Sequence, residues 1–178
     1  MKLKNIETNR LILKQTTFED RNEIFKLLSD EEVVRYLNLN IHLDIQDTDN
    51  LLKEYFEGME NNIKFPYTII DKESKKFVGI FLIKLDLYNE EAFEFTIYLS
   101  KEFWGKGIYK EILPYMIKVA FEEIKTKNFR GYAKEKNIAS IKVLEKSNFI
   151  LEKIFEVDGI EEKIYSFLIT EEMYKRMV

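Results

Sequence analysis

Three strand-like segments follow one another in the middle of the chain, separated by short turns. They read FPYTIID (Phe65–Asp71), FVGIFLIKL (Phe77–Leu85) and AFEFTIYLS (Ala92–Ser100). Segments this rich in β-branched and aromatic residues are typical of strands, and charged runs such as DKESKK between them are typical of turns. The sequence therefore predicts a β-sheet as the framework of the fold.

Helical and strand patterns flank this run on both sides. Before it, the sequence predicts a strand at Arg10–Gln15, a helix capped by Thr17 with Asp20 three residues on, and helices at Glu31–Leu37 and Gln46–Asn61. After it, we expect a helix at Gly107–Lys125, a strand at Phe129–Lys134, a helix at Ala139–Ser147, and antiparallel strands at Phe149–Asp158 and Lys163–Ile169 that turn at Gly159. These elements predict an α/β fold (an α+β mixed sheet) with helices on both faces. No repeat or linker interrupts them, so we expect a single domain over residues 1–178.

The residues that the chain lacks exclude several kinds of site. Without cysteine there is no disulfide, thiol nucleophile or cysteine-ligated metal. Because His42 is the single histidine, three-histidine and HExxH zinc sites are excluded. No nucleophile-elbow motif lies near His42, so nothing suggests a Ser-His-Asp triad. We therefore expect no metal, and chemistry that uses carboxylates, hydroxyls, lysines or a bound cofactor.

Charge and hydropathy narrow the class of protein further. The net charge is −4, whereas a nucleic-acid-binding protein normally carries a basic face. The first residues, MKLKNIETNR, contain no apolar signal region, and no uncharged stretch approaches the roughly 20 residues of a membrane span. We expect a cytoplasmic protein that binds neither nucleic acid nor membrane.

A strand-to-helix junction carries two of the six glycines, Gly105 and Gly107, within the segment FTIYLSKEFWGKGIYKEIL (residues 95–113). Glycine lets the backbone turn sharply and lets a ligand approach closely. The free N–H groups at the start of the following helix attract anions, and Lys106 and Lys110 add positive charge. This arrangement favours a phosphate or pyrophosphate site.

Several interpretations of this junction compete. A P-loop needs GxxxxGK[ST], which is absent, and a dinucleotide fingerprint needs a small residue where Lys110 stands. The pyrophosphate loop of an acyl-CoA-dependent N-acetyltransferase and a simple glycine cap beside a solvated lysine both fit. The junction alone leaves these last two open.

Five segments spread over nearly the whole chain carry a family resemblance: TNRLILKQTTFED (8–20), SDEEVVRYL (29–37), FVGIFLI (77–83), EFWGKGIYKEIL (102–113) and NIASIKVLEKSNF (137–149). In order and spacing they resemble the ribosomal-protein N-terminal-alanine acetyltransferase branch of the GNAT superfamily. The resemblance implies a GNAT-like acyl-CoA N-acyltransferase fold, with a mostly antiparallel sheet that splays between two parallel central strands. It also implies acetyl-CoA as co-substrate.

The resemblance assigns cofactor-binding roles to particular residues. The backbone from Gly105 through Lys106, Gly107 and Ile108 to Tyr109 would hold the pyrophosphate, after a tryptophan, Trp104, that is usual in this branch. The strand edge at Ile97, Tyr98 and Leu99 would pair with the pantetheine arm. Asn137 would hydrogen-bond the pantetheine, a role compatible with a plain helix N-cap.

Three residues depart from the family pattern. Tyr109 is bulkier than the usual residue and is expected to reshape the pyrophosphate loop. Pro114 lies inside the predicted long helix, where it should kink or loosen the first turns. Asn148 replaces a glycine, a mild change because asparagine tolerates left-handed geometry.

Glu94 is the candidate general base. Strand alternation places Glu94, Thr96 and Tyr98 on one face and Phe93 and Phe95 on the other. A carboxylate within such a strand either lines a cleft, where it can deprotonate an ammonium, or is simply exposed at an edge. Both interpretations stay open at this point.

The other catalytic roles have less specific candidates. The resemblance places Ser140 where it could protonate or orient the thiolate, although it could also be only a helix-start hydroxyl. Tyr98, Tyr109 and Tyr132 are alternative acids, and a strand N–H near Tyr98 or Leu99 would stabilise the oxyanion. Because the chain has no cysteine, we expect direct transfer in a ternary complex.

Acidic segments bear on the acceptor, because in relatives the helices after the first strand and the final hairpin wall the acceptor groove. The acidic residues there are Asp44, Asp47, Asp49, Glu54, Glu57 and Glu60, then Glu156, Asp158, Glu161 and Glu162. They favour a primary amine, either a basic peptide N-terminus or a small cationic amine such as a polyamine or an aminoglycoside, unless they are ordinary solvated faces. A non-catalytic acyl-CoA-binding or sensing module and a transferase for another acyl chain stay open, with a nucleotide-binding protein as a more distant alternative. A homodimer is expected only by family analogy.

Overall fold

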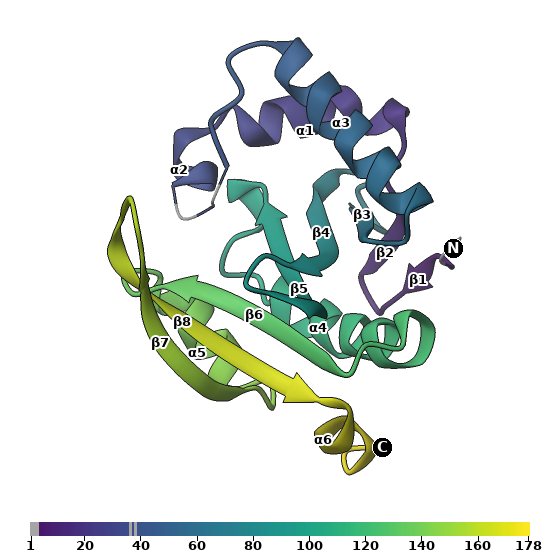
Figure 1. Ribbon diagram of the computed structural model, residues 1–178. Coiled ribbons are helices and arrows are strands. Elements are labelled where there is room, and N and C mark those ends of the chain that lie inside the picture. Colours follow the sequence, from purple (N-terminus) through teal and green to yellow (C-terminus); the bar gives the residue numbers. More distant parts are fainter. Residues whose placement is uncertain (1–3, 36, 38) are drawn as a thin grey trace. The chain divides into compact units, whose positions relative to one another are not determined.

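The computed structural model describes residues 4–35, 37 and 39–178. Contacts divide the chain into an N-terminal unit, Met1–Ile83 with Ile97–Ile108, and a C-terminal unit, Lys84–Thr96 with Tyr109–Val178. Strands β4 (Phe77–Asp86) and β5 (Asn89–Leu99), which are labelled in Figure 1, contribute residues to both units. The expectation of a single domain stays a prediction.

The described strands form one mixed sheet, with hydrogen-bonded neighbours in the order β1-β2-β3-β4-β5-β6-β8-β7. The remaining strands are β1 (Ile6–Glu7), β2 (Leu11–Gln15), β3 (Lys64–Asp71), β6 (Asn128–Lys134), β7 (Ile150–Val157) and β8 (Ile160–Thr170). Strands β5 and β6 run parallel, whereas β1–β2, β2–β3, β6–β8 and β7–β8 are antiparallel. The predicted mixed sheet with a parallel pair is confirmed.

The parallel ladder between β5 and β6 is short. Its rungs join Phe93 to Phe129, Glu94 to Arg130, and Phe95 to Gly131. Strand β5 continues beyond the last rung to Leu99, and β6 continues to Lys134. The peptide groups of β5 beyond Phe95 and of β6 beyond Gly131 are therefore not part of this parallel ladder.

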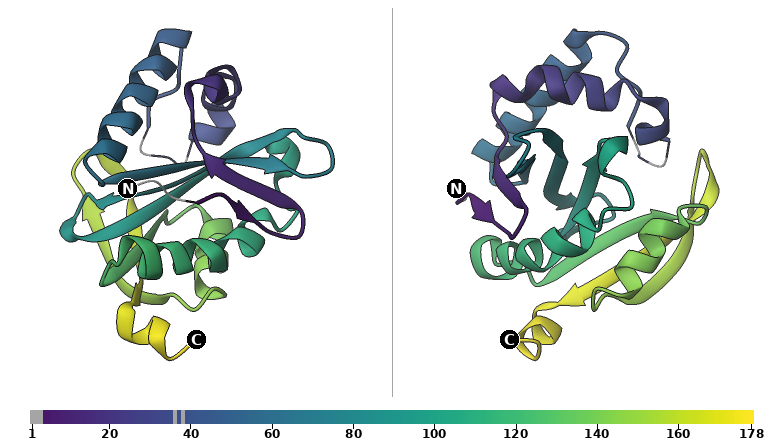
Figure 2. Two further views of the ribbon diagram at one scale, coloured as in Figure 1. Left: turned by 90° about the vertical axis from the view of Figure 1, so that its right-hand side faces the viewer. Right: turned by 180° about the vertical axis from the view of Figure 1, so that it is seen from behind.

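Helices of the N-terminal unit pack on its strands through apolar stripes at helical spacing. They are the 3₁₀ turn η1 (Phe18–Asp20), α1 (Arg21–Leu28), α2 (Glu31–Val34) and α3 (Ile45–Glu60). α1 and α3 lie side by side on one side of the strands (Figure 2). Ile24 and Leu28 of α1 and Leu52 of α3 share a buried cluster with Ile80 and Leu82 of β4. The capping box that the sequence predicts at Thr17 and Asp20 is present.

The structure differs most from the predicted secondary structure between residues 108 and 125. The helix expected at Gly107–Lys125 is α4 (Ile108–Lys118) followed by a π-helical turn, η3 (Val119–Ile124). α4 continues through Pro114, so the expected loosening of its first turns is not seen, although the proline lacks the N–H that would bond the carbonyl of Lys110. The other helices are α5 (Ile138–Glu145) and α6 (Glu171–Lys175).

Most predicted elements are confirmed to within a few residues. Strand β1 and helix α6 were not predicted, because each is too short to show a periodic pattern. Tyr36, in the predicted helix Glu31–Leu37, lies outside the described residues. None of the helices in the described part of the chain is long and apolar enough to cross a membrane.

Gly79 allows β4 and β5 to approach closely in the N-terminal unit. A Cβ added to Gly79 would lie 1.9 Å from the carbonyl oxygen of Tyr98 and 3.0 Å from the Cα of Leu99. Both obstacles are backbone, so no side-chain rotation can relieve the clash. A side chain at position 79 would therefore displace the part of β5 for which the resemblance implies pantetheine pairing.

Gly79→Ala should lower the free energy of unfolding by about 3 kcal/mol, the upper end of typical overpacking costs. Gly159→Ala is the matched control: Gly159 has φ 81° and no heavy atom within 4 Å of an added Cβ, so only its backbone geometry is penalised. Gly159→Ala should lower the free energy of unfolding by about 1 kcal/mol. Urea unfolding curves measure both, and equal costs would contradict the close approach.

His42 is buried ahead of α3. Its ring Nδ1 lies 2.8 Å from the hydroxyl of Thr48, and its backbone N–H donates to the carbonyl of Leu28 at 3.0 Å. Burial lowers the pKa of His42 below its usual value, against the opposing charge of Asp47. The imidazole is therefore held neutral, as a structural group.

In the unfolded chain His42 binds a proton near pH 6.5, whereas in the folded chain it binds that proton only at a lower pH. The stability that the neutral ring contributes is complete above about pH 6.5 and is lost as the pH falls towards the folded-state pKa. In His42→Gln, we expect the loss of unfolding free energy between pH 7 and pH 5 to be smaller than in the wild type. Urea titrations at each pH test this, and parallel pH dependences in the two proteins would refute it.

Candidate active site

An exposed glycine loop follows strand β5 in the N-terminal unit. Gly105 and Gly107 have φ of 71° and 74°, in the left-handed region that favours glycine. The loop is anchored at both ends by buried side chains, Phe103 at 7% exposure and Ile108 at 3%. Ile108 begins α4, so the loop leads directly into helix N–H groups that are free to bind an anion.

Positive side chains surround this loop. A Cβ on Gly107 would lie 3.9 Å from Nη2 of Arg10, so that guanidinium lies beside the glycine. The ammonium of Lys106 lies over the ring of Phe103, 5.1 Å from its centroid. Arg10 was not a predicted site residue: it lies in one of the segments that carry the resemblance, but it is distant in sequence from the glycine loop. The loop thus combines free N–H groups with nearby cations.

Trp104 fastens the start of the loop to the end of β5. Its indole N–H donates to the carbonyl of Leu99 at 2.8 Å, while the side chain stays 45% exposed. That carbonyl belongs to the strand edge expected to pair with pantetheine. The indole therefore already uses one acceptor of this edge.

Gly107→Ala should weaken CoA binding about tenfold, because a side chain at φ 74° costs roughly 1–2 kcal/mol and the loop relaxes away from its present geometry. Isothermal titration with CoA measures the dissociation constant. Gly159→Ala imposes a similar backbone penalty in the β7–β8 turn and should bind CoA as the wild type does. Equal affinities of all three proteins would show that the loop does not hold the pyrophosphate.

In the C-terminal unit, Glu94 lies on a polar face of β5. Its side chain is buried and forms an ion pair with Lys84 of β4, with Nζ 3.0 Å from Oε1. Phe95, the next residue, contacts the rings of Tyr109, Phe129 and Phe149 on the opposite face, as the predicted alternation requires. The exposed-edge interpretation of Glu94 is therefore wrong.

Burial raises the pKa of the Glu94 carboxyl, the charge of Lys84 works against that rise, and the charge of Asp86 adds to it. A carboxyl with a raised pKa is a better proton acceptor than an exposed one. The position is therefore chemically suited to a general base.

A network of polar groups, of which Asp86 and Arg130 are buried, lies beside Glu94, and the sequence patterns did not indicate it. Asp86 accepts hydrogen bonds from the hydroxyl of Tyr132 at 2.8 Å and from Arg130 at 3.3 Å. Arg130 also forms a bidentate pair with Glu152, both bonds being 2.8 Å. Strand β6 places Arg130 opposite Glu94 in the parallel ladder. Only the pairing of strands distant in sequence brings these residues together.

Helix α5 starts at the two other predicted residues of the C-terminal unit. The side chain of Asn137 caps the helix, its Oδ1 accepting from the backbone N–H of Ser140 at 3.2 Å. Among the described residues, neither the amide nitrogen of Asn137 nor the hydroxyl of Ser140 has a hydrogen-bond partner. Both groups have free capacity for a ligand.

Two of the tyrosines that the sequence offers as alternative acids, Tyr109 and Tyr132, lie in this unit and are weak candidates for that role. Burial, with the neighbouring Asp86, raises the pKa of Tyr132, and burial raises the pKa of Tyr109. The hydroxyl of Tyr132 already donates to Asp86. A phenol held in this way gives up its proton less readily than an ordinary tyrosine.

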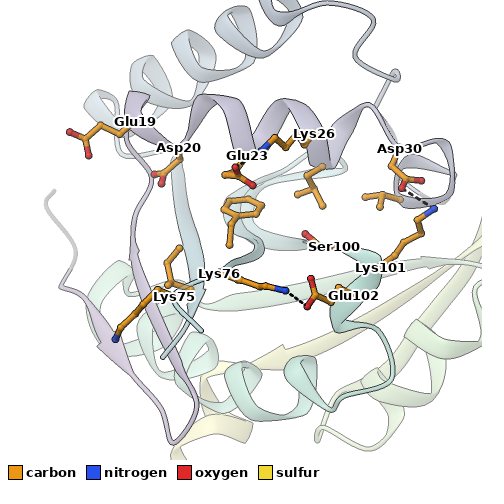
Figure 3. A pocket seen from close by; sticks show the side chains of 14 residues that line it. Glu19, Asp20, Glu23, Lys26, Asp30, Lys75, Lys76, Ser100, Lys101 and Glu102 are labelled. Carbon is orange, nitrogen blue, oxygen red and sulfur yellow. Dashed lines mark hydrogen bonds and ion pairs between the residues drawn. The ribbon is translucent and has the colours of Figure 1, made fainter. Parts of the chain in front are cut away.

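A separate cavity of about 640 Å³ lies in the N-terminal unit (Figure 3). Apolar side chains such as Leu27 line it together with five carboxylates and four lysines. Its charges largely pair with each other: Lys76 with Glu102 at 2.6 Å, and Lys101 with Asp30 at 2.9 Å. None of the predicted site residues lines it, and we assign it no catalytic role.

Several residues of the predicted acidic rim have structural partners. Asp44 and Asp47 form the capping box of α3, Asp49 pairs with Arg21, and Glu54 with Lys64. Asp49 and Glu54 contribute less to attracting a cation than their number suggests, because a cation already pairs with each of them, whereas Asp44 and Asp47 accept from backbone N–H groups.

Comparison with known proteins identifies the family. The acetyltransferase (GNAT) domain matches residues 10–150, most of the chain. The chain belongs to this family. The predicted family and the predicted class of enzyme, an acetyl-CoA-dependent acetyltransferase, are confirmed.

Individual relatives agree with the GNAT assignment. The uncharacterized N-acetyltransferase p20 of Bacillus licheniformis is 26% identical over 152 residues, covering 83% of each chain. The ribosomal-protein-S5-alanine acetyltransferase of Vibrio fischeri superposes with a TM-score of 0.82 at 17% identity, covering 96% of this chain and 98% of that one. The spermidine N-acetyltransferase of Vibrio cholerae, in complex with CoA and spermine, gives 0.78 at 18% identity, covering 93% and 98%. At these identities the two structures establish the GNAT fold.

Proposed function

We propose that this GNAT acetyltransferase moves an acetyl group directly from acetyl-CoA to a primary amine, either a peptide N-terminus or a small cationic amine. The observation that supports it most is the buried carboxylate of Glu94, whose pKa is raised by burial. Amine acetylation needs a base near neutral pH, because the acceptor arrives as an ammonium ion.

The proposed cofactor contacts fall into two groups. In the N-terminal unit, Gly105, Lys106, Gly107 and Ile108 offer backbone N–H groups to the pyrophosphate, with the cation of Arg10 beside Gly107. The same unit contributes Ile97, Tyr98 and Leu99 as the pantetheine edge, and Trp104 as the support of the loop. In the C-terminal unit, Tyr109 continues the loop, and Asn137 and Ser140 offer their unengaged polar groups.

The proposed chemistry assigns each proton to a residue. Glu94 takes a proton from the acceptor's ammonium, which gives the neutral amine its nucleophilic lone pair. A backbone N–H near Tyr98 or Leu99 stabilises the negative oxygen that forms when the amine adds to the thioester carbonyl. As the carbon–sulfur bond breaks, the hydroxyl of Ser140 orients the departing thiolate or relays to it the second proton, which the amine nitrogen loses as it becomes the amide nitrogen. The amide and free CoA are the products.

Two structural neighbours support the proposed class of acceptor. The named substrates are a ribosomal-protein alanine in one and spermidine in the other. Both present a primary amine, and both would arrive as cations. Polyamines and peptide N-termini are therefore the first acceptors to test.

One observation favours a second candidate function. Lys84 already holds the carboxylate of Glu94 at 3.0 Å, as an acceptor's ammonium would. If that pair does not open, the protein would bind acyl-CoA without acetylating an amine.

Thermal unfolding with acetyl-CoA, CoA, ATP or NAD at matched concentrations tests cofactor binding. A ligand at 100 times its dissociation constant adds about 2.7 kcal/mol, which raises the midpoint by a few degrees for a chain of this size. We expect a shift with acetyl-CoA and CoA alone. A shift with ATP or NAD, and none with CoA, would contradict the proposed site.

Glu94→Gln should lower kcat/KM for amine acetylation about 10²- to 10⁴-fold, the usual contribution of a general base, and leave CoA binding unchanged. Glu91→Gln is the control, since Glu91 is an exposed glutamate of the same strand. Release of free CoA during incubation with spermidine, and separately with an alanine-led peptide, measures the rate. Full activity of Glu94→Gln would exclude Glu94 as the base, and binding without acetylation by the wild type would support the second candidate.

A further inference from the structure

Three carboxylates of the C-terminal unit, Asp86, Glu94 and Glu152, form ion pairs with two cations, Lys84 and Arg130. Two of the carboxylates are held by several donors each. Asp86 accepts from Arg130, from the Tyr132 hydroxyl and from the backbone N–H of Tyr88 at 2.8 Å. Glu152 accepts two bonds from Arg130, and one from the Ser166 hydroxyl at 2.9 Å.

Glu94 is different, because its described partner is a single group. Its carboxylate meets Lys84 Nζ at 3.0 Å, and the side chains are 5% and 21% exposed respectively. Arg130 faces Glu94 across the ladder but is committed to Asp86 and Glu152. The charge of Glu94 therefore depends on one lysine.

We propose that Lys84 is a positioning residue for acetyl transfer, which aims the Glu94 carboxylate and keeps it ionised until the acceptor's ammonium takes its place. This inference rests on the proposed function, in which Glu94 is the base. Lys84 lies on strand β4, and Glu94 lies on strand β5. Two strands of one unit therefore set the orientation of the carboxylate.

The other groups that face Glu94 do not substitute for Lys84. Asp86 carries the same sign of charge as Glu94 and raises the pKa of that carboxyl. Tyr88 and Tyr132 have pKa values raised by burial, so both are neutral at any physiological pH. Lys84 is the one cation in contact with Glu94 among the residues that the structure describes.

The first test measures ionisation without turnover. Glutamate labelled with ¹³C at the side-chain carboxyl allows each carboxyl to be titrated by NMR, and Glu94→Gln identifies the resonance. We compare the wild type with Lys84→Met, which removes the charge and keeps most of the stem, and Lys84→Arg, which keeps the charge.

In Lys84→Met, the midpoint of Glu94 should rise by about one pH unit or more, the usual effect of losing an adjacent opposite charge. Lys84→Arg should restore it. An unmoved midpoint in folded Lys84→Met overturns the role of Lys84, whatever the activity of the wild type.

The second test follows kcat/KM for acetyl-CoA and spermidine, and for the alanine-led peptide, against pH. We expect the acidic limb of Lys84→Met to move by the same amount as the NMR midpoint, and Lys84→Arg to follow the wild type. A merely structural lysine would lower the folded fraction without moving that limb. A moved NMR midpoint with an unmoved limb also overturns the proposal.

The failure of the proposed function has a separate signature. If Glu94→Gln acetylates these amines as fast as the wild type does, Glu94 is not the base. That result overturns both proposals, whereas an unmoved midpoint in Lys84→Met overturns only this one.

Discussion

The guanidinium of Arg130 is the interaction on which the polar face of the C-terminal unit depends. It reaches Asp86 of β4 and Glu152 of β7 from its own strand β6, and so ties together strands far apart in the chain. The pair with Asp86 is buried, and breaking a buried pair typically costs about 3–5 kcal/mol, because it leaves a buried charge without its partner. Because Arg130 pairs with both of these carboxylates, Lys84 is the cation that pairs with Glu94 among the described residues. The charge of Glu94 therefore depends on Lys84.

The glycine loop of the N-terminal unit is stabilised in a different way. Phe103 and Ile108 bury their side chains on either side of it, and the residues between them stay exposed. The positive φ of Gly105 and Gly107 turns the backbone without a steric penalty. Apolar anchors therefore fix the two ends of the loop.

The sequence could predict the elements and the loop because both depend on local pattern. The alternation of Glu94 and Phe95 is visible within one strand, and the two glycines stand at a recognisable strand-to-helix junction. The partners of Glu94 could not be predicted in the same way. Lys84, Asp86, Arg130 and Glu152 lie on three other strands, and only the register of the sheet brings them together. Arg10 beside Gly107 is missing from the sequence interpretation for the same reason. The π-helical turn after α4 has no local signal that we can identify.

The indole of Trp104 is hydrogen-bonded to the end of β5, directly before the glycine loop, and it is the chain's single tryptophan. Its emission therefore comes from one place in the molecule and carries no background from other indoles. Because the ring is partly exposed and its N–H is bound to a strand carbonyl, rearrangement of the loop changes both its solvation and its hydrogen bonding. The wild-type protein thus carries an intrinsic optical label at the loop, and the state of that loop can be followed in solution without any added dye.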